Sequence, residues 1–517
     1  MIGFGCWFVR KSGTTSEFMA AGGSLPGWAV GMSIFGTYLS SNTFLGNPGK
    51  SYAGDYNAFV FTLSLPLAAW IATKYFVPFY RRSGEISAYH HLEARFGLWA
   101  RTYAMVCYVM SQIARMGTIM FGVALGLNAL TGWDVASIIV VTGVLVTLYT
   151  LLGGIEAVIW TDVVQSLVLM GGALLVFALL LMKMPDGPTQ AFTIAAADNK
   201  LSLGSWHADF KTNTVWVVFL FGLFINLTNF GIDQSFVQRY HTADSEAAAK
   251  RSIWIGVIFY IPISLLFFAI GSALFSYYQT EPELLGEVKR QVAAEQLSVS
   301  LTDIAGTTAE AAVQQTANAM TPADYGDKVL PHFIANKLPV GLAGLLIAAI
   351  FAAAMSSIDT SLNSSATVFL KDIYGRYIDH NVSEGRAMLV LRTATIVIGV
   401  IGTATAVILI GQQSILDAWW KLQGIFAGGM LGLFLLGLVA RSANGGAALV
   451  SVIIGVLVIG WMTFFPVIEN QPEWLRNPLH TNMTIVIGTL TIFLVGLLVS
   501  SFTPYQPPVE PHRSQTD

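Results

Sequence analysis

Oxygen-bearing side chains gather in an apolar stretch at residues 351–365. Hydroxyl, carbonyl and carboxylate oxygens suit a hard cation, whereas imidazole or thiolate would suit a transition metal. Hydroxyls that bond back to carbonyls of their own helix are the alternative, but seven hydroxyl or carboxylate side chains between Ser356 and Ser365 exceed what it explains. The stretch therefore predicts a cation site. At about 100° per residue, one helical face carries Ala353, Ser356, Asp359, Thr360 and Asn363.

Two charged residues lie inside other apolar runs. Arg115 lies inside the third run, which begins near Tyr103, and Asp162 is surrounded by Val, Ile and Trp residues. A charge near the centre of a bilayer costs ~3 kcal/mol, so each of these residues should have a partner or a function. A structural salt bridge is an equally good interpretation of both, and Asp162 also lies near the cytoplasmic end of its run.

Polar and small residues interrupt the first and sixth apolar runs, at residues 36–43 and 226–234. A break in a membrane helix exposes backbone groups, which is tolerated where they line a cavity. Breaks at matched positions predict two inverted five-helix repeats around a central site. Packing of helices through small residues is the alternative. The polar residues of the second break are Asn226, Thr228, Asn229, Gly231, Asp233 and Gln234.

The composition requires a membrane as solvent. Hydrophobic residues make up 54% of the 517 residues and charged residues only 11%, where a soluble domain carries about 25%. A spanning helix needs about 20 mostly apolar residues. We therefore expect an all-α polytopic membrane protein with about 12 transmembrane helices. These begin near Trp28, Phe59, Tyr103, Val135, Val158, Val215, Ile253, Leu338, Thr393, Leu422, Gly446 and Thr484.

Basic residues alternate between the loops and predict the orientation. They concentrate in the even-numbered loops, so the amino end and these loops should be cytoplasmic. We expect a multi-pass protein of a bacterial inner (plasma) membrane. The net charge of −3 gives no reason to expect nucleic acid, and no obligate protein partner is evident. The basic residues are Arg81, Arg82, Arg95, Arg101, Arg239, Lys250, Arg251, Lys371, Arg376, Arg386 and Arg392.

The predicted organisation has six parts. Residues 1–25 are a cytoplasmic amino-terminal segment, 26–184 the first five-helix repeat, and 185–213 an external loop. Residues 214–440 are the second repeat, which contains an external insert at 279–337. Two additional helices follow at 441–502, and a polar, proline-rich tail at 503–517 is expected to be disordered. The insert is interpreted as a solvated decoration, with a wall of a binding cleft as the alternative.

Several segments carry a resemblance to a known family. The chain resembles the sodium:solute symporter family over nearly its whole length, and within it the bacterial sialic acid transporters most. The resemblance implies the five-plus-five inverted-repeat symporter fold with broken first and sixth helices. Its segments are Pro26-Gly-Trp-Ala, Leu39-Ser-Ser-Asn-Thr-Phe, Ser87-Ala-Tyr-His-His-Leu, Gly153-Gly-Ile-Glu-Ala-Val-Ile-Trp-Thr-Asp, Asp233-Gln-Ser-Phe-Val-Gln-Arg-Tyr and residues 348–363.

The same resemblance implies three sites. The implied principal sodium site uses carbonyls of Gly36, Leu39 and Ala353 and hydroxyls of Ser356 and Ser357. The implied second sodium site uses Asp162, Asp359 and Thr360 and shares Ser356. The implied solute site holds Tyr38, Ser40, Thr43, Thr62 and Arg115, with Arg115 gripping a carboxylate as a bidentate fork.

The chain departs from the family pattern at several positions. Asp359 stands where the sialic acid branch has serine, so the second site could bind a cation more tightly or hold a proton. Tyr38 replaces a small hydroxyl residue and Thr62 a glutamine, which changes the shape of the pocket. The sugar-transporting branch matches less well, since Thr62 and Asn229 occupy the positions of its glutamate and gating tyrosine. The family helix before the first broken span is missing, which points to a truncated start.

These features together predict a sodium-coupled secondary active symporter. We expect it to import a sialic acid or related acidic sugar by alternating access, with two sodium ions. A neutral sugar or polyol is the alternative substrate. A membrane sensor or receptor is a remote alternative, because such proteins normally add a soluble output domain. An enzyme is not expected, since no nucleophile–base pair or metal cluster is evident, and a channel would need a continuous polar stripe.

Overall fold

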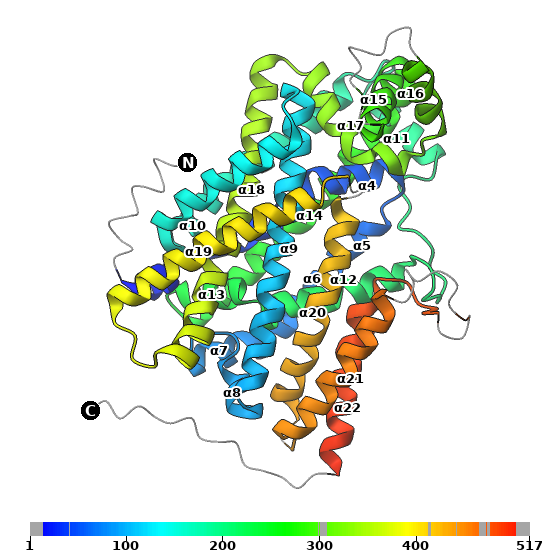
Figure 1. Ribbon diagram of the computed structural model, residues 1–517. Coiled ribbons are helices and arrows are strands. Elements are labelled where there is room, and N and C mark those ends of the chain that lie inside the picture. Colours follow the sequence, from blue (N-terminus) through cyan, green and yellow to red (C-terminus); the bar gives the residue numbers. More distant parts are fainter. Residues whose placement is uncertain are drawn as a thin grey trace.

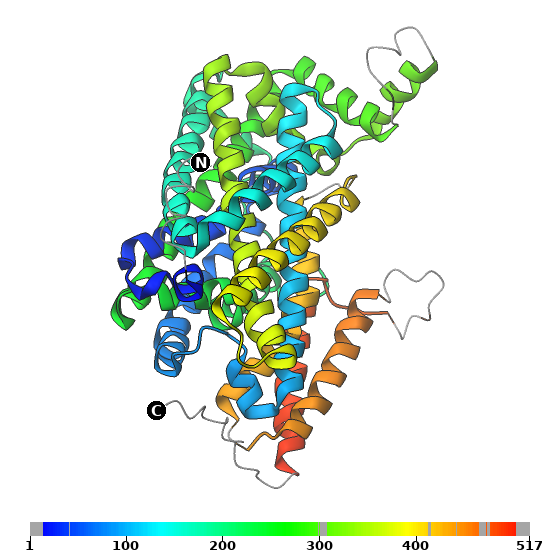
Figure 2. The same cartoon turned by 60° about the vertical axis from the view of Figure 1, so that its left-hand side comes forward.

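The computed structural model describes residues 14–40, 42–297, 299, 308–411, 415–440, 442–464, 472 and 476–502. Every element within these ranges is helical, apart from one isolated bridge between Leu25 and Ala243. Long helices form one bundle, and a group of shorter helices from the insert projects at one end (Figures 1 and 2). The all-α fold class is confirmed.

The twelve predicted spans all fall on helices. Ten helices of the described chain are long and apolar enough to cross a membrane. The predicted fourth and fifth spans form one element, α10 (Val135–Met182), which bends at Gly154 with a φ of 59°, a backbone conformation that favours glycine. Its first part, Val135–Leu148, is a shorter apolar helix. The remaining span is the broken first helix.

The first and sixth predicted spans are both interrupted. The first consists of α3 (Gly27–Tyr38), a π-helical turn η3 (Asn42–Gly46) and α4 (Asn47–Ala53), with Leu39 non-helical at φ −84° and ψ 88°. The sixth consists of α12 (Val215–Ile232) and α13 (Gln234–Thr242), with extended backbone at Asp233. Both predicted breaks are therefore confirmed.

The two broken helices lie inside a shell of continuous ones. α3 packs against α10 and α14 (Glu246–Thr280), while α18 (Val340–Val368) packs against α10 and α9 (Leu98–Thr131). α12 contacts α20 (Ile415–Val439). The free backbone ends at both breaks thus face the interior of the bundle.

The described residues of the insert form three helices, α15 (Pro282–Gln296), α16 (Thr308–Ala319) and α17 (Pro322–Lys337). α16 packs on α15, whereas α17 lies against α4 and α9. The contact with α4 is close: a Cβ atom added to Gly326 would lie 2.7 Å from the carbonyl oxygen of Gly49. One helix of the insert is therefore part of the packed body next to the first broken helix.

The other helices complete the bundle and its connections. A short amino-terminal helix precedes α3, and the second span is divided into short helical pieces. Their bounds are α2 (Thr15–Ala20), η2 (Ala21–Gly23), η4 (Asn57–Phe59), α5 (Val60–Leu63), α6 (Leu65–Ile71), η5 (Ala72–Phe76), α7 (Val77–Ser83), α8 (His90–Phe96), α11 (Pro188–Ala197), η6 (Phe369–Ile378), α19 (Glu384–Ile408), α21 (Gly445–Phe464) and α22 (Met483–Ser501).

Candidate functional site

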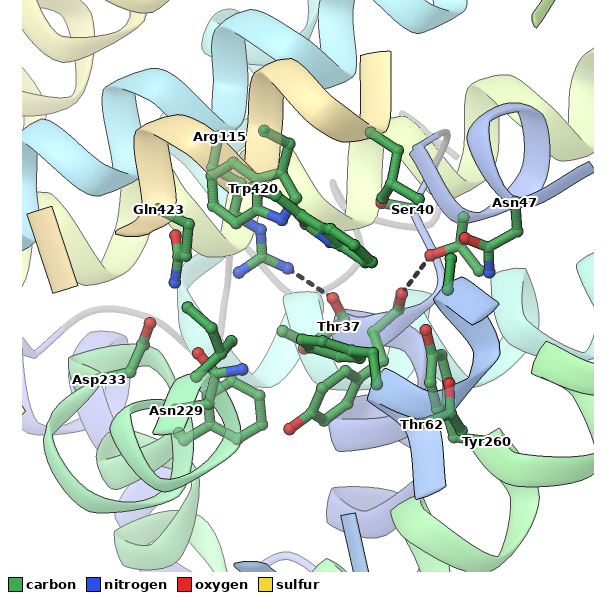
Figure 3. Close-up of a pocket in the computed structure, with 18 of the residues that line it drawn as sticks. Thr37, Ser40, Asn47, Thr62, Arg115, Asn229, Asp233, Tyr260, Trp420 and Gln423 are labelled. Carbon is green, nitrogen blue, oxygen red and sulfur yellow. Dashed lines mark hydrogen bonds between the residues drawn. The ribbon is translucent and has the colours of Figure 1, made fainter. Parts of the chain in front are cut away.

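A cavity lies where the two helix breaks meet, and residues from six spans line it (Figure 3). Its volume is about 90 Å³, smaller than the roughly 300–1,000 Å³ usual for a small-molecule pocket. A sugar-sized solute must therefore displace side chains as it enters. The polar lining residues are Thr37, Ser40, Thr43, Asn47, Thr62, Gln112, Arg115, Asn229, Asp233 and Gln423, with Tyr38, Tyr260, Trp419 and Trp420 among the aromatic ones.

The structure brings all five predicted solute residues to this cavity. Two of their hydroxyls are tied to neighbouring helices: Tyr38 Oη donates to Asn226 Oδ1 at 3.1 Å, and Thr62 Oγ1 lies 2.9 Å from Ser264 Oγ. Thr43 Oγ1 donates to the Tyr38 carbonyl at 2.7 Å, which satisfies a group left free by the break. The local polar residues thus stabilise the break and shape the cavity.

Arg115 reaches the broken end of α3 from the facing helix α9. Its guanidinium donates to the carbonyl oxygen of Thr37 at 2.5 Å, a contact that is visible in Figure 3. That carbonyl belongs to the last turn of α3, where unpaired carbonyls and the helix dipole favour a cation. The predicted mid-membrane arginine therefore lines the cavity, and a backbone carbonyl holds its guanidinium there.

Sequence reasoning missed an acidic residue on the opposite wall. Asp233 accepts from Ser235 N at 2.8 Å and from Gln112 Nε2 at 3.2 Å, and it lines the same cavity as Arg115. Its place in the polar break of the sixth span was the available signal. Gln423, which accepts from Ser111 at 3.0 Å, comes from α20, and no sequence pattern pointed to it.

The predicted principal sodium ligands lie on two packed helices. Gly36 and Leu39 end α3, which contacts α18, and α18 carries the other three residues. All five residues are buried. Among the described residues, the Ser357 hydroxyl has no hydrogen-bond partner. Buried carbonyl and hydroxyl oxygens at a helix break fit sodium, so the assignment stays a prediction that this geometry supports.

The predicted second site contains an ion pair. Asp162 accepts from the Ser356 hydroxyl and from Ser33 Oγ, the latter at 2.5 Å. The guanidinium of Arg239 lies 3.0 Å from Asp162 Oδ2 and 3.0 Å from Thr360 Oγ1. A second cation would have to share Asp162 with this arginine or depend mainly on the buried Asp359, which lies on the same helix as Ser356.

Arg239 corrects the sequence analysis at one point. We expected it in a cytoplasmic loop, but it lies in α13, the second half of the sixth broken helix, and is fully buried. It also donates to Ser33 Oγ at 2.8 Å, so it joins three spans at once. The structural salt bridge considered for Asp162 is therefore present.

The comparisons with known proteins agree on one family. A model of the sodium:solute symporter family matches residues 18–455. The sodium/sialic acid symporter SiaT of Proteus mirabilis (strain HI4320) is 36% identical over 464 residues, covering 89% of this chain and 86% of that protein. The sodium/sialic acid symporter NanT of Aliivibrio fischeri (strain ATCC 700601 / ES114) is 32% identical over 509 residues, covering 97% and 90%.

Solved structures share the architecture. A Na⁺-coupled sialic acid symporter, described as substrate-bound and outward-open, matches with a TM-score of 0.83 and 31% identity, covering 98% of this chain and 96% of that one. Mhp1, a nucleobase-cation-symport-1 transporter, matches with a TM-score of 0.54 at 14% identity, covering 94% of each chain. The second likeness extends to the fold alone.

Proposed function

Since this chain belongs to the sodium:solute symporter family, we propose that it imports a sialic acid or a related acidic sugar together with sodium, in a bacterial inner membrane. Ten long apolar helices and the match with a Na⁺-coupled sialic acid symporter support a multi-pass transporter of this kind. The two broken helices supply a central site, which alternating access would open to one side of the membrane at a time.

Arg115 carries the substrate assignment. In the described part of the chain its hydrogen bond goes to the Thr37 carbonyl and not to a carboxylate. A solute carboxylate can replace that carbonyl and accept two parallel hydrogen bonds from the guanidinium fork. The remaining hydroxyl, amide and aromatic lining suits the ring and hydroxyls of a sugar. An acidic sugar satisfies both parts of the site.

Sodium coupling rests on the contact between α3 and α18. The broken end of α3 offers backbone carbonyls, and α18 offers the hydroxyls of Ser356 and Ser357. A sodium ion there would hold the two helices together, so its binding and release would favour different arrangements of the bundle. We propose two sodium ions, the second near Asp162 and Asp359.

Ligand-dependent thermal stability tests this function directly. The purified protein would be melted in sodium or potassium buffer with N-acetylneuraminic acid or with a neutral sugar of similar size. A ligand present at 100 times its dissociation constant stabilises the folded state by about 2.7 kcal/mol. We expect this gain with the acidic sugar in sodium only. Equal stabilisation by the neutral sugar would overturn the substrate class, and equal stabilisation in potassium would overturn the coupling ion.

A further inference from the structure

A much larger cavity lies away from the solute site, between α6–α7, α12, α14 and α20. Its volume is about 790 Å³. Its walls are mostly apolar, and three basic side chains also line it: Lys74, Arg82 and Lys250. No described residue of the solute cavity lines this second cavity. We refer to it below as the basic cavity.

The charges of the basic cavity are not balanced. Lys250 forms an ion pair with Glu246 at 2.7 Å. Among the described residues, Lys74 and Arg82 form no ion pair, and the ammonium of Lys74 lies over the rings of Trp70 and Tyr75, at 4.9 and 5.3 Å from their centres. Glu246 also lies near enough to Arg82 to interact with it electrostatically, so three basic groups of the cavity face one carboxylate. A bound anion could therefore meet Lys74 and Arg82, neither of which forms an ion pair with a described residue.

The position of the basic cavity relates it to the lipid bilayer. Tyr75 is 49% exposed and lies in the half of the second span, Asn57–Ser83, that is nearer Arg82; exposed Tyr is enriched at the interfaces of a membrane. Arg82 follows Lys74 by eight residues, or about 12 Å along a helix, at the end that the loop charges assign to the cytoplasm. The cavity thus lies where phospholipid headgroups of the cytoplasmic leaflet meet their acyl chains.

The chemistry of the walls matches a phospholipid better than a soluble anion. Phe79 and the α20 residues Leu435 and Leu438 form apolar walls beside the basic groups. A free phosphate would use the cations but gain nothing from these walls. An anionic phospholipid uses both, because basic pockets between membrane helices on the cytoplasmic side hold its headgroup while its chains cover apolar surface.

We propose that the basic cavity binds an anionic phospholipid of the cytoplasmic leaflet. Lys74 and Arg82 hold the headgroup phosphate, and the acyl chains lie along Phe79, Leu435 and Leu438. The cavity reaches Leu227 of α12, the residue after Asn226, whose amide oxygen accepts from Tyr38. The bound lipid therefore contacts the broken helix that also builds the solute site.

Native mass spectrometry of the purified full chain tests the proposal, with phosphatidylglycerol and phosphatidylcholine as probes. We expect the wild type to retain phosphatidylglycerol preferentially. Each Lys or Arg near the membrane surface strengthens the binding of an anionic lipid. The double variant Lys74→Gln with Arg82→Gln removes two such charges, so its affinity for phosphatidylglycerol should fall about thirtyfold. Arg392→Gln is the matched control. Arg392 is an exposed basic residue of α19 on the cytoplasmic side, outside the cavity.

The outcomes separate the alternatives. Equal retention of the two lipids, or an equal loss in the Arg392→Gln control, would overturn the proposal. Displacement of phosphatidylglycerol by inorganic phosphate alone, with no effect of acyl chain length, would replace the lipid with a free-phosphate site. A charge-keeping variant, Lys74→Arg with Arg82→Lys, should retain the lipid. If that variant folds but loses binding as fully as the glutamine variant, charge is not the cause.

Discussion

At the scale of single residues, the Ser357 hydroxyl allows a direct test of the proposed sodium site. It is fully buried on α18 and has no hydrogen-bond partner among the described residues. An unsatisfied buried polar group costs about 1–3 kcal/mol. A cation next to this hydroxyl would compensate that cost. Removing the Ser357 hydroxyl should therefore weaken sodium binding more than removing other hydroxyls of the helix.

Ser357→Ala should therefore reduce sodium affinity without destabilising the sodium-free protein. We expect the sodium concentration at half-maximal stabilisation to rise about tenfold, which corresponds to about 1.4 kcal/mol. Thermal melts across a sodium titration would measure it. Ser365→Ala is the control, because the Ser365 hydroxyl is on the same helix, is equally buried and also has no hydrogen-bond partner in the described part of the chain. Equal effects of the two variants would contradict the site assignment.

Adding Ser356→Ala to Ser357→Ala should abolish sodium-driven uptake.

Arg115→Lys should weaken acidic solutes because lysine keeps the charge but lacks the planar fork. A charge-assisted hydrogen bond contributes about 1.5–3 kcal/mol, so we expect a tenfold to hundredfold loss of affinity, about 1.4–2.8 kcal/mol. Isothermal titration with N-acetylneuraminic acid would measure this loss. A neutral analogue, if bound, should lose less. Equal losses would mean that Arg115 mainly holds the end of α3 through the Thr37 carbonyl.

Single residues could be predicted where the local sequence shows a break or an isolated charge. The five solute residues share one cavity because they lie at a broken helix or face it. Arg239 was misplaced for the opposite reason: its neighbours in sequence resemble a charged loop, and its partner Asp162 is 77 residues away. Burial of that pair depends on four helices, α3, α10, α13 and α18, packing together, which no local pattern reveals.

At the scale of elements, the pair of Asp162 and Arg239 joins α10 to α13. Removing one partner of a buried ion pair leaves an uncompensated charge and costs about 3–5 kcal/mol. Asp162→Asn and Arg239→Gln should each lower the thermal stability strongly, and the double variant should recover part of the loss. Melts of the four proteins without sodium would give the coupling energy. Additive losses would mean that the pair contributes nothing beyond its separate side chains.

The contact between α4 and α17 gives a second prediction. A Cβ atom at Gly49 would lie 2.9 Å from the backbone nitrogen of Asp327, so Gly49→Ala should overpack the contact and destabilise the protein by about 1–3 kcal/mol. Gly286→Ala in α15 is the control. Nothing lies within 4 Å of its added Cβ, and alanine favours a helix over glycine by up to about 1 kcal/mol. A stable Gly49→Ala protein would show that the two helices can separate.

The positions of the helices were easier to predict from the sequence than the contacts of single residues. Runs of apolar residues are long enough to locate all twelve spans, and polar residues in the first and sixth runs locate both breaks. The packing of the insert was harder to predict from the sequence. α17 buries Val329, Leu330, Phe333 and Ile334, but its average composition is too polar to stand out from a solvated loop helix.

At the scale of the whole molecule, the number of sodium ions decides whether the membrane potential contributes to uptake. One sodium with a monoanionic solute is electroneutral. Two leave one net positive charge, worth about 2.3 kcal/mol per 100 mV and roughly fiftyfold extra accumulation. Because Arg239 already pairs with Asp162, the second ion should depend on Asp359, whose carboxylate adds the further negative charge.

We therefore expect a transport current in proteoliposomes and a sodium Hill coefficient above one at fixed pH. In Asp359→Ala, which removes the carboxylate and leaves no ligand oxygen, the coefficient should fall towards one. Current recordings with a monoanionic substrate would measure both quantities. An electroneutral cycle would contradict the two-sodium stoichiometry. A current that follows pH instead of the second sodium would mean that Asp359 carries a proton.

The close packing of Gly49 and Gly326 has a practical consequence. The backbones of α4 and α17 approach each other closely there, and the Asp327 side chain lies beside Gly49. We therefore expect the two helices to move together when the first broken helix tilts. α15 and α16 project from these helices at the end of the molecule (Figure 2). A rotation of α4 and α17 should therefore displace α15 and α16 by a larger distance. We expect an antibody fragment that binds these two helices and the adjoining body together to recognise one state of the cycle and to inhibit transport without entering the solute pathway.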